Sequence, residues 1–248
     1  MKKSLALAGL LASASALSAQ ITTVLDDFSG SLSNWSSTTI LNNGTATLNT
    51  SALTLSGGAL NYVTTAYDGV EQAAHIFANR SLAVGEELQL SVAADVTGSQ
   101  DFGLYVGIAP TAATTASSST RASYVSIYKR NNEQIFTRGF ANTTEYALAG
   151  GATVSTAVTL FIARTLTNTF EVGYYDAVSA RTVLSTRVDA TNSAAAIGLY
   201  TDVRATGTLG SVDNFAIYNA TAVPEPSAFA ALAGLAVLGF GASRRRRA

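Results

Sequence analysis

The feature that most constrains the fold of this chain is an alternation of apolar and polar residues with a period of two. It is clearest in residues 88–97, where Leu88 and Leu90 alternate with polar neighbours, and it recurs in Phe102–Ala109. Successive side chains of a β-strand point to opposite faces, so this period predicts strands that bury one face. Because residues 98–101 are turn-forming types, we expect the two segments to pair as a hairpin.

Further segments of the same kind recur along the chain, and turn chemistry such as Asn42–Gly44, Gly57-Gly58 and Gly150-Gly151 separates them. They are Thr45–Leu55, Leu60–Thr65, Ala73–Ala78, Tyr124–Lys129, Gln134–Phe140, Val158–Arg164, Phe170–Tyr175, Thr182–Val188, Ala196–Asp202 and Val212–Tyr218. Amphipathic helical patterns do not interrupt the series. The sequence therefore predicts an all-β, antiparallel β-sandwich, with a β-solenoid as the alternative.

The start of the chain is typical of a secretory signal peptide. Within residues 1–19, two lysines precede an apolar stretch, Leu5–Leu11, and small residues lead to a cleavage site expected between Ala16 and Gln20. Residues 20–219 are then expected to form one β-sandwich domain, since about 200 residues suffice for a single all-β domain. The chain has no cysteine, so the core of an exported domain must hold without disulfides.

Residues 220–248 combine a rigid motif, an apolar run and a basic cluster. Prolines on both sides of Glu225 keep residues 223–226 extended, so a helix begins only after them. The apolar run Ala228–Ala242 predicts one short transmembrane helix just under the usual span of about 30 Å. The arginines of residues 244–247 are expected to stay cytoplasmic, which places the body outside the inner membrane.

This tail resembles the PEP-CTERM sorting signal of Gram-negative bacteria. The family's signal is a Pro-Glu-Pro motif, a short transmembrane helix and an Arg-rich end, which match in order the residues Val223, Pro224, Glu225, Pro226, Ala228–Ala242, Arg244, Arg245, Arg246 and Arg247. The resemblance implies that an exosortase recognises the motif and removes the helix, which releases the protein to the envelope or exterior. Such proteins typically occur in bacteria that make exopolysaccharide. An ordinary C-terminal anchor is the alternative.

Charge separates the ends of the chain from the body. The two end segments hold six of the fifteen basic residues and one of the sixteen acidic residues, so the body carries a net charge of −6. This acidity argues against nucleic acid or anionic lipid as a partner. It is compatible with a neutral, hydroxyl-rich partner.

The body also resembles the jelly rolls of concanavalin A-like lectins and glucanases. The residues that carry this resemblance are Asp26–Ser29, Leu32–Trp35, Leu53–Ser56, Gly198–Tyr200 and Ser211–Ile217. In that family the first and last strands lie together. The resemblance therefore implies that Phe28 and Phe215 share a core region.

Catalytic chemistry finds little support in the sequence. The single histidine, His75, lies in an apolar segment and is interpreted as structural, and no Gly-x-Ser-x-Gly elbow or Glu-x-Asp-x-x-Glu strand is present. We interpret Glu86-Glu87 as a solvated turn, and Glu171 and Asp176 are too far apart in register to act as a pair. The sequence predicts no catalytic residue, no metal site and no cofactor.

Two weaker hypotheses concern binding. Asp26, Asp27 and Asp213 would gather calcium ligands if the terminal strands pair, although capping of strand ends is the preferred interpretation. Tyrosines lie opposite the aliphatic faces of the predicted strands, at Tyr105, Tyr124, Tyr128, Tyr175 and Tyr200. Some of them, if exposed on one sheet, would suit sugar binding, but ordinary sheet packing is the preferred explanation for each.

The sequence thus predicts an exported, non-enzymatic envelope or extracellular-matrix protein with weak carbohydrate affinity. Its expected partners are an exosortase, the inner membrane transiently, and exopolysaccharide. A secreted glycan-degrading enzyme and a purely structural surface protein are the alternatives.

Overall fold

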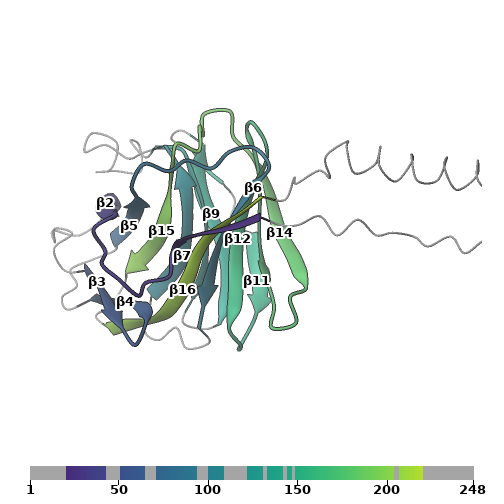
Figure 1. The fold of residues 1–248 in the computed structure, drawn as a ribbon. Coiled ribbons are helices and arrows are strands. Elements are labelled where there is room, and N and C mark those ends of the chain that lie inside the picture. Colours follow the sequence, from purple (N-terminus) through teal and green to yellow (C-terminus); the bar gives the residue numbers. More distant parts are fainter. Residues whose placement is uncertain are drawn as a thin grey trace, which may run out of the picture. The chain divides into compact units, whose positions relative to one another are not determined.

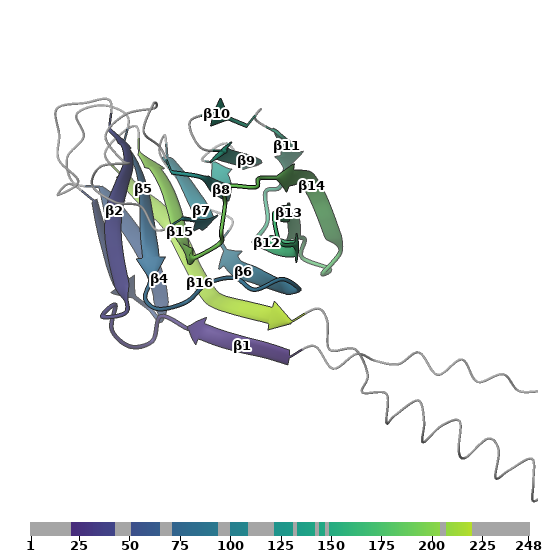
Figure 2. The ribbon, with the colours of Figure 1, turned by 90° about the horizontal axis from the view of Figure 1, so that it is seen from above.

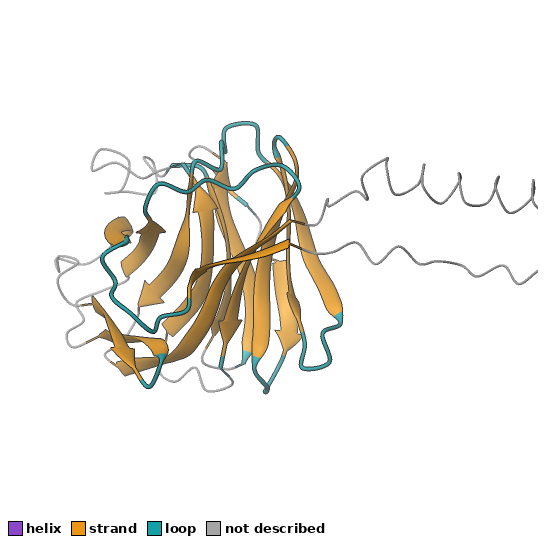
Figure 3. Cartoon of the chain, viewed as in Figure 1, coloured by secondary structure: helices purple, strands orange, loops and turns teal. Residues whose placement is uncertain are grey.

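The period-two segments form strands, and these build two antiparallel sheets. The computed structural model describes residues 21–42, 51–64, 71–93, 100–108, 122–130, 133–141, 144–146, 149–203 and 207–219. Every regular element among these residues is a strand (Figure 3). Residues Ile21–Ala220 make up one compact unit of the chain. The prediction of an all-β sandwich is confirmed.

Each sheet has eight strands. Figure 1 shows the course of the chain through them. Sheet A has the order β14 (Arg181–Val188), β13 (Thr169–Tyr175), β12 (Val158–Leu166), β6 (Glu86–Val92), β16 (Gly207–Asn219), β4 (Ala59–Thr64) and β3 (Ser51–Ser56), with β1 (Ile21–Asp26) paired to β16. Sheet B has the order β10 (Thr144–Glu145), β9 (Gln134–Ala141), β8 (Tyr124–Arg130), β7 (Gln100–Gly107), β15 (Ala196–Val203), β5 (Glu71–Phe77) and β2 (Trp35–Asn42), with β11 (Ala149–Thr153) paired to β9.

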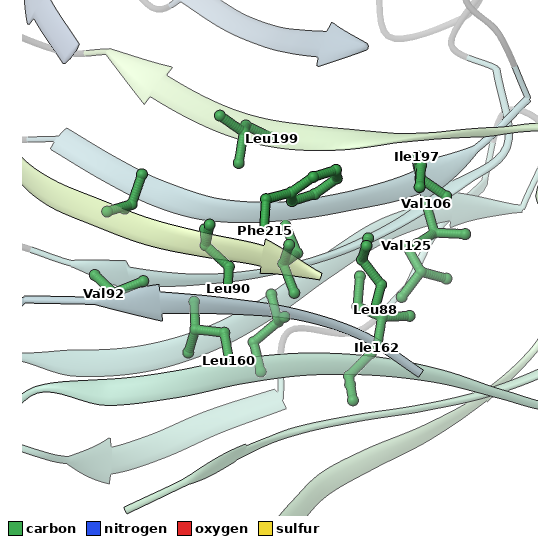
Figure 4. Close-up of a cluster of buried hydrophobic side chains, with 14 of the residues drawn as sticks. Leu88, Leu90, Val92, Val106, Val125, Leu160, Ile162, Ile197, Leu199 and Phe215 are labelled. Carbon is green, nitrogen blue, oxygen red and sulfur yellow. The ribbon is translucent and has the colours of Figure 1, made fainter. Parts of the chain in front are cut away.

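The main core lies between the sheets, because each strand turns its aliphatic positions inward. Sheet A contributes Leu88, Leu90, Val92, Leu160 and Ile162, and sheet B contributes Val106, Val125, Ile197 and Leu199 (Figure 4). Each such side chain stabilises the fold by roughly 1.5–3 kcal/mol when fully buried. A core of this kind explains how the chain can fold without disulfides.

The expected hairpin between residues 88–97 and 102–109 is wrong. β6 pairs with β12 and β16 in sheet A, whereas β7 pairs with β15 and β8 in sheet B. The aliphatic faces of both strands do point into the core, but from opposite layers. Alternation determines which side of a strand is buried and leaves its hydrogen-bonding partner open.

Two turn assignments have different outcomes. Gly57 and Gly58 join β3 to β4, with φ angles of 65° and 76°, which is the left-handed backbone that two-residue hairpin turns require. Gly150, in contrast, lies inside β11, where the register with β9 shifts between Gly150 and Ala152. A bulge in a strand and a turn both favour glycine, so the residue type did not separate them.

The terminal strands lie together, as the jelly-roll resemblance implied. β1 runs antiparallel to β16, and Asp26 is in register with Phe215 (Figure 2). The ring of Trp35 lies 5.9 Å from that of Phe28 and 5.0 Å from that of Phe215. The expected common core region of Phe28 and Phe215 is therefore confirmed, and Trp35 of β2 joins the two rings.

Candidate functional site: the tyrosine face of sheet B

The outward face of sheet B carries most of the tyrosines singled out in the sequence. On β7, β8 and β15 the inward positions are mostly aliphatic, so the alternate positions place tyrosines outward. We call this surface the tyrosine face and define it by Tyr105, Tyr124, Tyr128 and Tyr200, with Phe136 and Phe140 beside them. Tyr128 and Tyr200 flank Gly103 in register, one from each neighbouring strand.

The rings of the tyrosine face stack across the strands. Ring centroids lie 5.2 Å apart for Tyr128 and Tyr200, and 5.4 Å apart for Tyr105 and Tyr124. All four tyrosines are fully buried, which agrees with sheet packing and not with an exposed platform. The ring tilts of 23° to 26° are those of stacked, closely packed aromatic groups. Sheet packing therefore accounts for the rings.

The phenol hydroxyls of the tyrosine face differ from one another in their hydrogen bonding. Tyr105 donates to the carbonyl oxygen of Ile108 at 2.9 Å. The hydroxyls of Tyr128 and Tyr200 are buried and have no hydrogen-bond partner within the described part of the chain. Burial raises the pKa of Tyr128 and Tyr200 well above its ordinary value, so both hydroxyls stay protonated. A buried hydroxyl without a partner lowers the stability of the fold by about 1–3 kcal/mol. The two hydroxyls are therefore candidates for hydrogen bonds to a ligand.

Charged groups follow one edge of the tyrosine face. Asp101 of β7 and Asp202 of β15 are in register on neighbouring strands. Asp101 accepts from Arg130 at 2.8 and 2.9 Å. Asp202 accepts from the Gln72 amide at 2.9 Å. Sequence reasoning missed this pair of carboxylates, which are distant in the chain, because finding it required the unpredicted pairing of β7 with β15.

Arg138 of β9 lies between the buried Asp202 and the solvent-exposed Glu145. Its guanidinium donates to a carboxylate oxygen of Glu145 at 2.7 Å and lies 3.6 Å from a carboxylate oxygen of Asp202. The Arg138 side chain is 16% exposed and that of Glu145 is 41% exposed. These two side chains are therefore reachable from solvent, whereas the rings beside them are not.

Gly103 allows the tyrosine face to close, and its replacement by alanine tests this. A Cβ there would lie 2.5 Å from the Cα of Tyr128 and even closer to the carbonyl oxygen of Ile127. Both are backbone atoms of β8, so β7 and β8 would have to separate. We expect Gly103→Ala to lower the free energy of unfolding by about 3 kcal/mol in urea titrations.

Gly30→Ala is the matched control for Gly103→Ala. A Cβ on Gly30 meets nothing within 4 Å, so this variant is expected to stay within about 0.5 kcal/mol of the wild type. Equal effects of the two substitutions would contradict the close approach at Gly103.

His75 lies on β5 of sheet B, between β2 and β15. It is buried, and its two ring nitrogens lie 2.6 Å from the Ser37 hydroxyl and 3.1 Å from the Thr201 hydroxyl. Burial lowers the pKa of His75 to about 4, so the imidazole is neutral at neutral pH.

The interpretation of Glu86-Glu87 as a solvated turn is wrong. Both residues begin β6, and Glu87 is buried on the outward face of sheet A. The Glu87 carboxylate accepts from the Tyr175 hydroxyl at 2.8 Å and from Arg181 at 3.1 Å. A buried charge on a strand is held by such partners, which the local sequence does not reveal. Tyr175 thus belongs to sheet A and not to the tyrosine face.

The aspartates considered for calcium hold nearby groups instead. Asp26 accepts from the backbone N–H of Phe28 at 2.7 Å and from the Trp35 indole at 2.6 Å. Asp27 accepts from Ser29, and Asp213 accepts from the backbone of Asn214. Groups of three or more potential metal ligands are not found among the residues that the structure describes.

The sorting residues predicted in the tail lie outside the described residues, as do residues 1–19. This applies to Val223–Pro226, to Ala228–Ala242 and to Arg244–Arg247. Within the described ranges, no helix is long and apolar enough to cross a membrane.

Comparison with protein families decides the nature of the tail. Residues 222–247 match the model of the PEP-CTERM protein-sorting motif. The chain carries a PEP-CTERM sorting motif. The motif implies recognition by an exosortase and export with a C-terminal membrane-anchoring signal. It covers only the end of the chain, so the PEP-CTERM assignment says nothing of the activity of the body.

The body is similar in fold to solved jelly rolls. One is a β-1,3-1,4-glucanase from a mouse hindgut metagenome, with 9% identity, 81% of this chain and 98% of that chain covered, and a TM-score of 0.50. Another is one of the endo-acting O-glycanases that human gut microbiota express to initiate mucin breakdown, with 10% identity, 79% and 98% covered, and a TM-score of 0.50. At such identities the likeness concerns the fold alone. Comparison with curated proteins gave no match.

Proposed function

We propose that this PEP-CTERM protein is a non-enzymatic component of the envelope or extracellular matrix that binds carbohydrate weakly at the tyrosine face. The sorting motif supports export and exosortase processing. The observation that carries the binding proposal is the pair of buried hydroxyls, on Tyr128 and Tyr200, that have no partner in the described part of the chain. Saccharide hydroxyls both donate and accept hydrogen bonds, so they can satisfy two neutral phenols.

Entry to the face is from the edge where Arg138 and Glu145 are exposed, because the rings themselves are buried. Weak affinity follows from this geometry. Because the hydroxyls are buried, neighbouring groups must move before a saccharide can form hydrogen bonds with them. The free energy of that rearrangement reduces the net affinity.

The carboxylates at the edge support a non-enzymatic role. Glycoside hydrolysis needs one carboxyl group to protonate the leaving oxygen and a second to attack or to activate water. Asp101 accepts two guanidinium N–H groups from Arg130, and Asp202 is held by Gln72 with Arg138 nearby. Carboxylates that already accept hydrogen bonds in this way are typical of structural roles.

A glycan-degrading enzyme is the second candidate, and the register of Asp101 with Asp202 is the observation that favours it. An assay for reducing ends released from polysaccharides distinguishes the two functions, because only an enzyme produces them. Turnover by the wild type that is lost in Asp202→Asn would overturn the non-enzymatic proposal.

Tyr200→Phe tests the binding proposal, because it removes one hydroxyl and keeps the ring. We expect the free energy of unfolding to rise by about 1 kcal/mol, since an unsatisfied buried group is removed. Affinity for oligosaccharides, measured by calorimetry, is expected to fall about 5- to 10-fold, since a ligand hydrogen bond is lost.

Tyr105→Phe is the matched control for Tyr200→Phe. Its hydroxyl already has a partner in the carbonyl of Ile108, so we expect a small loss of stability and unchanged affinity. If Tyr200→Phe stabilises the fold but leaves glycan binding unchanged, the tyrosine face is packing alone and the proposal fails.

A further inference from the structure

Arg138 has unused hydrogen-bonding capacity at the entrance to the tyrosine face. A guanidinium offers five N–H donors. Among the described residues, the Arg138 guanidinium makes one hydrogen bond, to Glu145, and its closest approach to Asp202 is 3.6 Å. Its side chain is 16% exposed, so the remaining donors are at the partly buried boundary between the tyrosine face and solvent. A planar fork of donors in such a place suits a carboxylate group.

Glu145, the partner of Arg138, is lightly anchored. It belongs to β10, a strand of two residues whose ladder partners, in the part of the chain that the structure describes, are Ala141 and Phe140 on β9. Its side chain is the more exposed member of the ion pair. Because the Glu145 carboxylate is 41% exposed and can be solvated when it leaves Arg138, a competing carboxylate can replace it at small cost.

We propose that the Arg138 guanidinium binds the carboxylate of an acidic sugar, a uronate, and that Glu145 occupies the place of that carboxylate in the ligand-free molecule. This inference rests on the proposed function of the tyrosine face. The sugar ring would then lie toward Tyr128 and Tyr200, whose hydroxyls need partners. Arg138 selects the charge of the ligand, and the tyrosines bind its hydroxyls.

The acidity of the body does not oppose this selection strongly. Its net charge of −6 repels a polyanion at long range, but at physiological salt such fields are screened beyond about 8 Å. A contact between a guanidinium and a carboxylate at hydrogen-bond distance is screened much less when it is partly buried. Arg130, which is also partly exposed at this edge, adds a second positive charge.

The test compares uronates with their uncharged counterparts. Trisaccharides of galacturonate, glucuronate and mannuronate, and the methyl ester of each, are titrated into the purified full-length chain by calorimetry. We expect at least one acid to bind about 10-fold or more tighter than its own ester. Glu145→Gln, which removes the internal competitor, is expected to raise affinity for that acid about 3- to 10-fold and to leave the ester unchanged.

Arg138 variants complete the test. Arg138→Gln is expected to abolish the preference for the acid. Arg138→Lys keeps the positive charge and is expected to retain part of that preference, so it serves as the test variant if Arg138→Gln proves unstable. Tyr200-dependent binding with equal affinity for acids and esters would overturn the uronate inference and leave the proposed function standing. Binding to none of these sugars and to no neutral oligosaccharide would overturn both. An increase in affinity for the ester in Glu145→Gln would also contradict the inference that Arg138 binds the carboxylate of the ligand.

Discussion

Replacing Phe215 with alanine is expected to destabilise the protein by about 3–5 kcal/mol, most of the stability of a typical domain. The ring is 0% exposed and sits on β16 of sheet A. Its centroid lies 5.0 Å from that of Trp35 and 5.7 Å from that of Phe77, both on sheet B. Phe215 thus joins the two sheets where the first and last strands pair, and alanine would leave a cavity that neither sheet can fill.

Unfolding in urea measures this effect, and the fluorescence of Trp35 reports it from within the same cluster. Trp35 is the only tryptophan of the chain, so the signal has a single origin. Val188→Ala is the control: this side chain is 65% exposed, and its loss is expected to change the stability by less than about 0.5 kcal/mol. A loss below about 1 kcal/mol for Phe215→Ala would contradict the role given to this ring.

The faces of the strands could be predicted from the sequence, whereas their partners could not. Leu88 and Leu90 on β6 and Val106 on β7 point into the core as alternation indicated. Their strands nevertheless belong to different sheets, because two strands that bury the same core fit equally well side by side or face to face. β1 and β2 were not predicted as strands: their Ser- and Thr-rich segments lack a clear apolar face.

The candidate site was predictable only in part, for the same reason. Alternation placed Tyr128 and Tyr200 opposite the aliphatic face, and the structure agrees. Their burial and their unsatisfied hydroxyls depend on neighbours that are distant in the chain. The ion pairs of Asp101 and Glu87 likewise join residues that no local pattern connects.

The largest expected effect on function comes from the sorting motif. Replacing Pro224, Glu225 and Pro226 with alanines removes the two residues that hold the backbone extended and puts strong helix formers in their place. A helix that begins near Ala228 could then extend upstream through the motif. An enzyme that reads an extended Pro-Glu-Pro segment would lose its substrate, so we expect processing to stop.

Thr221→Ala, just before the matched residues 222–247, is the control and is expected to be processed normally. The decisive measurement is the mass of the protein recovered from the medium and from the membranes of an exosortase-bearing host. We predict that the wild type leaves the membrane without residues 228–248, while the triple-alanine variant stays in the membrane at full length. Equal processing and release of the two proteins would contradict exosortase sorting and leave a plain membrane anchor.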